Sequence, residues 1–178
     1  MDGYHGMRRK EKEIGDPAEM RAILEGTPYI VVAMCRDNQP YLATLSHGYD
    51  AGRNAIYFHC AGEGKKIDFL KANDRVWGQA IDDRGYVQGK CDHRFASVQF
   101  GGRARFVEDA GEKRHALEVM IRQLERRPEK VLAGQVTEAA VRKVCIGRID
   151  IETMSGKKSL GIPFPDSADR NGRRRKRE

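Results

Sequence analysis

The sequence predicts a mainly β, α+β fold: a six-stranded antiparallel β-barrel, closed or nearly closed, with peripheral helices packed on its outside. Six short segments rich in β-branched and aromatic residues are separated by turn residues. Three further segments carry apolar residues at helical spacing. Strands and helices do not alternate as they do in a parallel sheet. The 178 residues suffice for one hydrophobic core and are too few for two.

The first expected element is a helix over 17–25. Asp16 is a good N-cap, Pro17 suits the first helical position, and Glu19 occupies the capping-box position. Gly26 is expected to end the helix. Its predicted apolar face consists of Met20, Ile23 and Leu24.

Six strands are expected after this helix, separated by turns and further helices. The polar segments 37–40, 50–54 and 82–85 indicate turns, and 89–94 reads as irregular. Gly101 and Gly102 interrupt the fifth strand and predict a bulge that helps the sheet to curl. The predicted strands are 29–35, 41–49, 55–60, 75–81, 95–107 and 143–151.

Two more helices are expected between these strands. One covers 65–72, and the longest covers 111–126. Their apolar positions are Ile67, Phe69 and Leu70 in the first helix and Leu117, Met120, Ile121 and Leu124 in the second. Tyr57 and Trp77, which lie in strands, are interpreted as core aromatics.

The formal net charge of +7 is concentrated at the C-terminal end. The segment 170–178 carries six basic residues and one acidic residue, and without it the chain is nearly neutral. We therefore expect a barrel domain over 1–165 and a basic, disordered tail over 166–178. Such a tail is more often solvated than bound to nucleic acid, which stays an alternative for this segment alone.

Cysteine usage and hydropathy indicate a cytoplasmic protein. Cys35, Cys60, Cys91 and Cys145 form no C-x-x-C pair, so reduced thiols that act as small buried hydrophobes are expected, and no metal site. Residues 1–13 are charged and do not form a secretory signal, and Met7 is an alternative start. No apolar run approaches the ~18 residues of a membrane span.

The segment with most chemical information is the glycine-rich turn that precedes the 65–72 helix. Gly62 and Gly64 let the backbone approach an anion, the helix start offers free N–H groups, and Lys65 and Lys66 add positive charge. This pattern indicates a phosphate site, although it lacks the spacing of a Walker A loop. The alternative is a solvated helix face with two exposed lysines.

Around this turn the chain resembles the flavin-binding split-barrel superfamily of pyridoxamine 5'-phosphate oxidases, and more closely its Nim-type, 5-nitroimidazole-resistance branch. The most specific part is the Ile56-Tyr57-Phe58-His59 block with the glycine and lysines that follow it. The matching segments, in order, are 7–10, 55–66, 70–76, 97–102 and 154–158.

The resemblance implies an FMN-binding split barrel that works as a homodimer. It implies that the strand 42–47 lies along the isoalloxazine ring, with much of the contact made by backbone. It further implies that His59 and Cys60 approach the ribityl chain or phosphate and that Ser97 reaches the flavin across the dimer interface. The expected FMN-binding residues are thus Leu42, Ala43, Thr44, Leu45, Ser46, His47, His59, Cys60, Lys65, Lys66 and Ser97.

Two departures from the family pattern limit the expected activity. Lys65 stands where the oxidase has arginine, so a point charge replaces a bidentate fork. The oxidase's arginine-rich C-terminal signature is absent, and 155–163 stands in its place. Pyridoxamine phosphate oxidase activity is therefore not expected.

The functional prediction is an FMN-dependent oxidoreductase or nitroreductase of the Nim type acting on a small molecule. His59 is the candidate catalytic residue, as a substrate ligand or proton donor; the alternative is a partly buried strand residue. Non-catalytic flavin binding or storage, and a haem- or deazaflavin-binding member of the same fold, are the other hypotheses.

Overall fold

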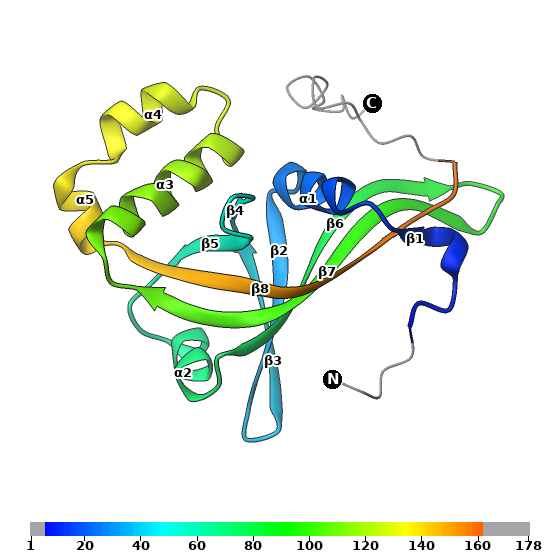
Figure 1. The fold of residues 1–178 in the computed structure, drawn as a ribbon, viewed down its shortest axis with the longest axis horizontal. Coiled ribbons are helices and arrows are strands. Elements are labelled where there is room, and N and C mark those ends of the chain that lie inside the picture. Colours follow the sequence, from blue (N-terminus) through cyan, green and yellow to red (C-terminus); the bar gives the residue numbers. More distant parts are fainter. Residues whose placement is uncertain (1–5, 162–178) are drawn as a thin grey trace.

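Eight strands form one curled antiparallel sheet in the computed structural model, which describes residues 6–161 (Figure 1). The strand order is β3-β2-β6-β7-β8-β5-β4, and β1 pairs with β8 beside this path. The end strands β3 and β4 do not pair with each other, so the barrel is split. The strands are β1 (Glu13–Ile14), β2 (Tyr29–Arg36), β3 (Gln39–Ser46), β4 (Gly48–Asp50), β5 (Ala55–Cys60), β6 (Arg75–Val87), β7 (Asp92–Val107) and β8 (Cys145–Lys158).

Helices lie around this sheet, as the sequence predicts. Figure 1 shows α3, α4 and α5 gathered at one end, while the β2–β3 hairpin projects away from them. α1 packs on β6 and β7, α2 on β2, and α3 on β4 and β5. The helices are η1 (Lys10–Lys12), α1 (Pro17–Gly26), α2 (Lys65–Ala72), α3 (Ala110–Leu124), α4 (Pro128–Gln135) and α5 (Glu138–Lys143).

The mainly β class is confirmed, but the predicted number of six strands is wrong. The predicted strand 41–49 is two strands, β3 and β4, because His47 turns its ring into the interior and interrupts the pairing. β1 has two residues, too few to produce a hydrophobic period. These two differences account for the eight strands.

The predicted turn at 82–85 is wrong, and the predicted irregular stretch at 89–94 is confirmed at 89–91 alone, since 92–94 belong to β7. β6 and β7 continue as a paired ribbon through this region, with a register shift between Asp83 and Tyr86, and the chain reverses at 88–91. Both faces of this ribbon carry polar side chains: Asp82 and Arg84 form an ion pair on one face, and Asp83, on the other, contacts His93. Without a buried face, the strands lack the alternation that would reveal them.

The predicted bulge at the paired glycines is confirmed. The register between β7 and β8 shifts between Gly101 and Gly102. A Cβ atom at Gly102 would lie 2.1 Å from the Asp150 carbonyl oxygen, so a side chain there would force the strands apart. β8 starts at Cys145 and continues to Lys158, beyond the predicted end at 151, and pairs with β7 along its length.

The curled sheet encloses the main core, which α1 and α2 close. The predicted apolar faces of both helices are confirmed as buried. Asp16 caps α1 by accepting a hydrogen bond from the Ala18 N–H at 2.8 Å. The largest fully buried side chains of this cluster are Phe58, Phe100, Ile23, Leu24, Ile30, Ile56 and Ile149.

A second, smaller core lies under α3. Tyr57, Val107, Ala116, Met120 and Ile146 form it. Among the predicted apolar positions of α3, Met120 is buried, whereas Leu124 is 40% exposed. α4, which the sequence did not predict, buries no residue completely, and α5 buries one.

The predicted domain end at 165, the basic segment 166–178 and Met1 lie outside the described residues. Among the helices of residues 6–161, none has the length and apolar character to cross a membrane.

Candidate functional site

The sheet has an unpaired seam between β3 and the last residues of β5. β3 ends the strand order and pairs along one side, with β2. β4 covers β5 at Ala55–Tyr57, so 58–60 have a strand partner, β8, on one side alone within the described sheet. β3 and β5 contact each other without pairing. Strand edges of this kind leave N–H and C=O groups free for a ligand.

The first turn of α2 lies at this seam. Lys65 Nζ lies 4.8 Å from the ring centre of Tyr41 in β3. Lys66 Nζ lies 5.7 Å from the ring centre of Phe58 in β5. Within residues 6–161 neither lysine has a carboxylate partner. The two strands that border the seam thus each meet one unpaired cation.

The turn before α2 has the properties of an anion cradle. No heavy atom lies within 4 Å of a Cβ placed at Gly62 or Gly64, and Gly64 has a φ of +115°, which favours glycine. Gly64 is the N-cap and contributes no side-chain acceptor. The Ile67 N–H donates to the Gly64 carbonyl oxygen at 2.8 Å, so within the first turn the N–H groups of Lys65 and Lys66 remain for solvent or an anion. Two ammonium groups and these N–H groups suit a phosphate monoester, and the residues therefore fit the phosphate of FMN.

β3 presents a row of side chains on its outer face. Leu42, Thr44 and Ser46 are exposed along it, and Leu42 is 64% exposed. Ala43 and Leu45 point to the other side, where Leu45 is buried in the core and Ala43 packs against it. Two parts of the predicted flavin-binding strand are therefore accessible to a ligand: this row of side chains and the unpaired backbone edge of β3.

His47 does not join that row. Its ring is fully buried, and Nε2 donates to the Leu24 carbonyl oxygen at 2.9 Å. Burial lowers the pKa of His47 to about 4, against the effect of this hydrogen bond, so the ring is neutral at pH 7. Nδ1 is a buried atom without a partner in the described structure. The structure places this predicted site residue in the core between α1 and α3.

His59 is exposed and lies on the other face of β5 from Phe58, because successive strand residues alternate. It opens on a groove of about 360 Å³. The groove is lined by His59, Leu117, Met120, Ile121, Leu124, Glu125, Val131, Gln135, Val136, Ala140 and Val144. Its walls are mostly apolar and come from α3, α4 and α5.

Cys60 is half-buried at the end of β5, on the Phe58 side, and packs against the main core. Lys66 is close enough to favour the thiolate form of Cys60 electrostatically. The structure thus brings together Cys60, Lys65, Lys66 and the β3 edge. His59 stands across the strand from this group.

Ser97 lies elsewhere, on the outer face of β7. It is 7% exposed, and its hydroxyl donates to the Lys157 carbonyl oxygen at 3.4 Å. Its β6 partner is Ile81. This outer face also carries large exposed side chains from three strands: Tyr29, Leu42, Trp77 and Ile81, which are 59%, 64%, 46% and 48% exposed. The interpretation of Trp77 as a core aromatic is wrong, whereas that of Tyr57, which is fully buried, is confirmed.

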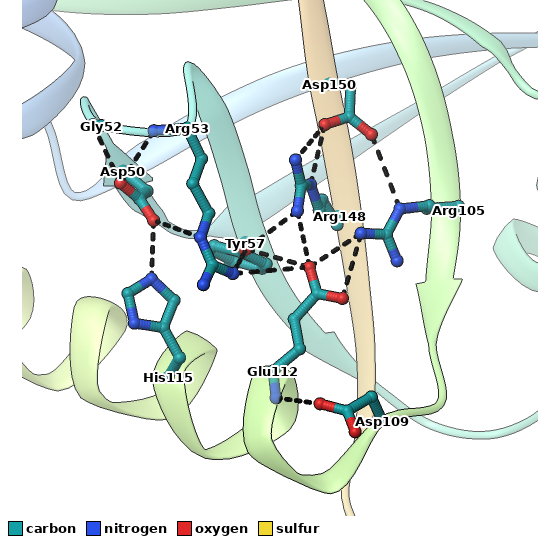
Figure 2. A network of polar contacts seen from close by, with 10 residues as sticks. All are labelled: Asp50, Gly52, Arg53, Tyr57, Arg105, Asp109, Glu112, His115, Arg148 and Asp150. Atoms are coloured by element: carbon teal, nitrogen blue, oxygen red, sulfur yellow. Dashed lines mark hydrogen bonds and ion pairs between the residues drawn. The ribbon is translucent and has the colours of Figure 1, made fainter.

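Sequence reasoning did not find the polar network at the start of α3 (Figure 2). Glu112 accepts hydrogen bonds from Arg148 at 2.6 Å, from Arg105 at 2.8 Å and from the Tyr57 hydroxyl at 3.1 Å. Burial raises the pKa of Glu112, but these hydrogen bonds outweigh it and lower the pKa to about 2. Asp109 caps the helix by accepting from the Glu112 N–H.

The same network continues to the β4–β5 turn (Figure 2). Asp50 accepts from His115 Nε2 at 2.6 Å and from the backbone of Gly52 and Arg53. Arg148 also bonds Asp150 at 2.8 Å. Every charged group in it faces an opposite charge or a hydrogen-bond partner. The network therefore fastens α3, one wall of the groove, to the sheet, and it leaves no group free for a reaction.

The sequence matches the family described as Pyridoxamine 5'-phosphate oxidase over residues 16–158. No curated protein has a matching sequence.

Similar solved structures share the fold. A protein described as a 5-nitroimidazole antibiotic resistance protein, from Bacteroides thetaiotaomicron, is 24% identical with a TM-score of 0.69, and the alignment covers 86% of this chain and 95% of that one. The flavocytochrome Anf3 from Azotobacter vinelandii is 20% identical with a TM-score of 0.73, covering 93% and 77%. An FAD-binding protein from Mesorhizobium loti is 24% identical with a TM-score of 0.58, covering 81% and 95%.

Proposed function

We propose that this chain, which belongs to the pyridoxamine 5'-phosphate oxidase family, binds FMN at the seam between β3 and β5 and is an FMN-dependent oxidoreductase or nitroreductase of the Nim type, acting on a small molecule. One observation carries the proposal. Lys65 and Lys66, both without ion-pair partners in the described chain, lie against the two strands that border the seam. An unpaired pair of cations beside a glycine turn is what a phosphate requires.

In this proposal Lys65, Lys66 and the first-turn N–H groups of α2 hold the FMN phosphate. FMN ends at this phosphate, whereas FAD continues through a second phosphate into an adenosine group, so the mass of the released cofactor distinguishes the two. The free edge and outer row of β3, from Leu42 to Ser46, hold the ring, and Cys60 borders the ribityl chain. Bound FMN would supply the electron-transfer chemistry.

A second copy of the chain completes the site in this proposal. The exposed Tyr29, Leu42, Trp77 and Ile81 form an apolar outer face that a partner would cover. Ser97 lies on the same face and is separated from the lysines within one chain, so its predicted contact with flavin requires the second copy. Four free cysteines support a reducing compartment, the cytoplasm.

Native mass spectrometry of the purified protein tests this proposal in one experiment. The expected species is a dimer that carries two FMN molecules and releases them on denaturation. A monomer with stoichiometric FMN would contradict the shared site. A dimer that carries FAD, haem or a deazaflavin would contradict the cofactor assignment.

His59 is the proposed catalytic residue. Its ring opens on an apolar groove of about 360 Å³, which suits a small aromatic acceptor, and a ring nitrogen would donate a proton to the reduced substrate. We expect His59→Asn to retain FMN and to slow oxidation of the reduced flavin by a nitroaromatic compound about 10²–10⁴-fold, measured by stopped-flow absorbance. Release of FMN instead would make His59 a cofactor ligand.

Non-catalytic flavin binding is a second candidate, and the position of His59 favours it. His59 lies across β5 from the Phe58 face that Lys66 contacts. If the variant keeps both FMN and the wild-type rate of flavin oxidation, His59 is a structural residue. Tight FMN binding by the wild type with no turnover by reduced nicotinamides would favour this second candidate.

A further inference from the structure

Two cysteines that are distant in sequence lie side by side in the sheet. Cys60 is the last residue of β5 and Cys145 the first of β8, and they are direct partners in the antiparallel register. Their sulfur atoms are 3.6 Å apart. Opposite residues of an antiparallel pair have Cα atoms about 4.5–5.5 Å apart, which lies within the range that a disulfide spans.

We propose that Cys60 and Cys145 are a site of reversible oxidation, at which a peroxide converts the two thiols into a disulfide. Small side-chain rotations suffice to bring the sulfur atoms from 3.6 Å to the bonding distance of about 2.05 Å. The proposal does not depend on flavin binding. It adds to the molecule a cross-link that the reduced structure already positions.

The reaction proceeds in two steps that balance. The Cys145 thiol releases its proton and the thiolate attacks one peroxide oxygen, the O–O bond breaks, and a sulfenic acid and hydroxide form; the hydroxide takes up the released proton as water. The Cys60 sulfur then attacks the Cys145 sulfur, the S–O bond breaks, and the Cys60 proton leaves with the hydroxide as a second water. Two thiols and one hydrogen peroxide thus give one disulfide and two water molecules.

The surroundings of the pair explain this order of attack. Burial and the neighbouring Cys145 raise the pKa of Cys60 to about 12, although Lys66 opposes the shift. A raised pKa disfavours the thiolate form of Cys60, which suits Cys60 to the role of the resolving thiol, since the thiolate is the nucleophile. Both side chains are half-buried, which leaves a path for a small oxidant.

The disulfide would join the end of β5 to the start of β8. Cys60 directly precedes the glycine turn of α2, and Cys145 follows α5. The cross-link closes a loop of 85 residues, which restricts the unfolded chain strongly. For a protein of this size we expect a rise in Tm of about 10 °C on oxidation.

Cys35 and Cys91 are exposed, whereas Cys60 and Cys145 are half-buried. Replacing the two exposed cysteines leaves the proposed pair as the cysteines that peroxide can oxidise. In the full chain carrying Cys35→Ser and Cys91→Ser, hydrogen peroxide is expected to reduce the denatured thiol count from two to none. Non-reducing peptide mapping is expected to find Cys60 linked to Cys145. Dithiothreitol should restore both thiols and the lower Tm.

Removing either partner gives the matched controls. In the same background, Cys60→Ser or Cys145→Ser should abolish the internal cross-link and the rise in Tm. Retention of two thiols after peroxide, or oxidation of each cysteine without a cross-link, would overturn the proposal, and so would a link between two chains in place of the internal one. The Cys35→Ser and Cys91→Ser background keeps Cys60 and Cys145. Its thiol count and its peptide map therefore do not depend on the folding of the Cys60→Ser or Cys145→Ser variant.

Discussion

Two groups of basic residues in this protein differ in how their charges are matched. Around the start of α3, Arg105 and Arg148 both form ion pairs with Glu112 and Asp150. Each of these four charged groups therefore has a partner of opposite charge in the same chain. At the start of α2, Lys65 and Lys66 contact aromatic rings and have no carboxylate partner in the described chain. The first group is built for stability, whereas the second retains the charge that an external anion would meet.

The location of the counter-charge separates structural cations from ligand-binding cations in this protein. Both regions lie next to β5, and both involve the first turn of a helix. Asp109 caps the N-terminus of α3 by accepting from the Glu112 N–H, whereas Gly64 supplies no side-chain cap for α2. A mutation in the first region should therefore change stability, and one in the second should change ligand affinity.

The largest effect is expected from Glu112→Ala. The variant removes the Glu112 carboxylate from Arg148, whose side chain is 15% exposed, and leaves Asp150 as its carboxylate partner. We expect the free energy of unfolding to fall by about 3 kcal/mol, measured by urea denaturation, because hydrogen bonds to a charged group contribute about 1.5–3 kcal/mol each while Arg148 keeps Asp150 as a partner. Glu118→Ala, in the same helix, is the matched control and should have little effect. Unchanged stability in Glu112→Ala would show that the two regions do not differ as described.

A smaller effect is expected on acidification of the wild type. Glu112 has a pKa of about 2 in the folded protein and an ordinary value of 4.5, so its contribution is present above pH 4.5 and is lost as pH falls towards 2. His47 has a folded pKa of about 4 and an ordinary value of 6.5, so its protonation on unfolding reduces stability between pH 6.5 and 4.

Urea denaturation across these pH ranges checks the prediction. We expect the Glu112 step to amount to about 2–3 kcal/mol and to vanish in Glu112→Gln, while the His47 step remains. A low-pH step of unchanged size in Glu112→Gln would mean that another carboxylate is responsible.

Sequence predicted those parts of the fold that depend on local signals. The apolar faces of α1 and α2 were identified correctly because their spacing is contained in one helix each. The helix α4 was not predicted, because it buries no residue completely and so has no clear apolar face in the sequence. The interruption at His47 could not be foreseen, since its partner Leu24 lies in another element.

The candidate site divides in the same way. The glycine turn with Lys65 and Lys66 is a contiguous pattern and was found. The partners of Glu112 come from β5, β7 and β8, and the sulfur contact of Cys60 lies 85 residues away. Without a structure, nothing in the sequence indicates such pairs. The face on which His59 lies also depends on the position of α3, which local spacing does not specify.

Isothermal titration calorimetry with FMN and riboflavin tests most directly whether Lys65 and Lys66 bind the phosphate of FMN. For Lys65→Ala combined with Lys66→Ala, we expect FMN affinity to fall by about 2–4 kcal/mol, since each charge-assisted contact contributes about 1.5–3 kcal/mol. Riboflavin, which has no phosphate, should bind the wild type weakly and the variant equally weakly. Lys71→Ala, at the other end of α2, is the control and should bind FMN as the wild type does. Equal losses for FMN and riboflavin in the double variant would contradict the claim, because the lysines would then support the fold and not the phosphate.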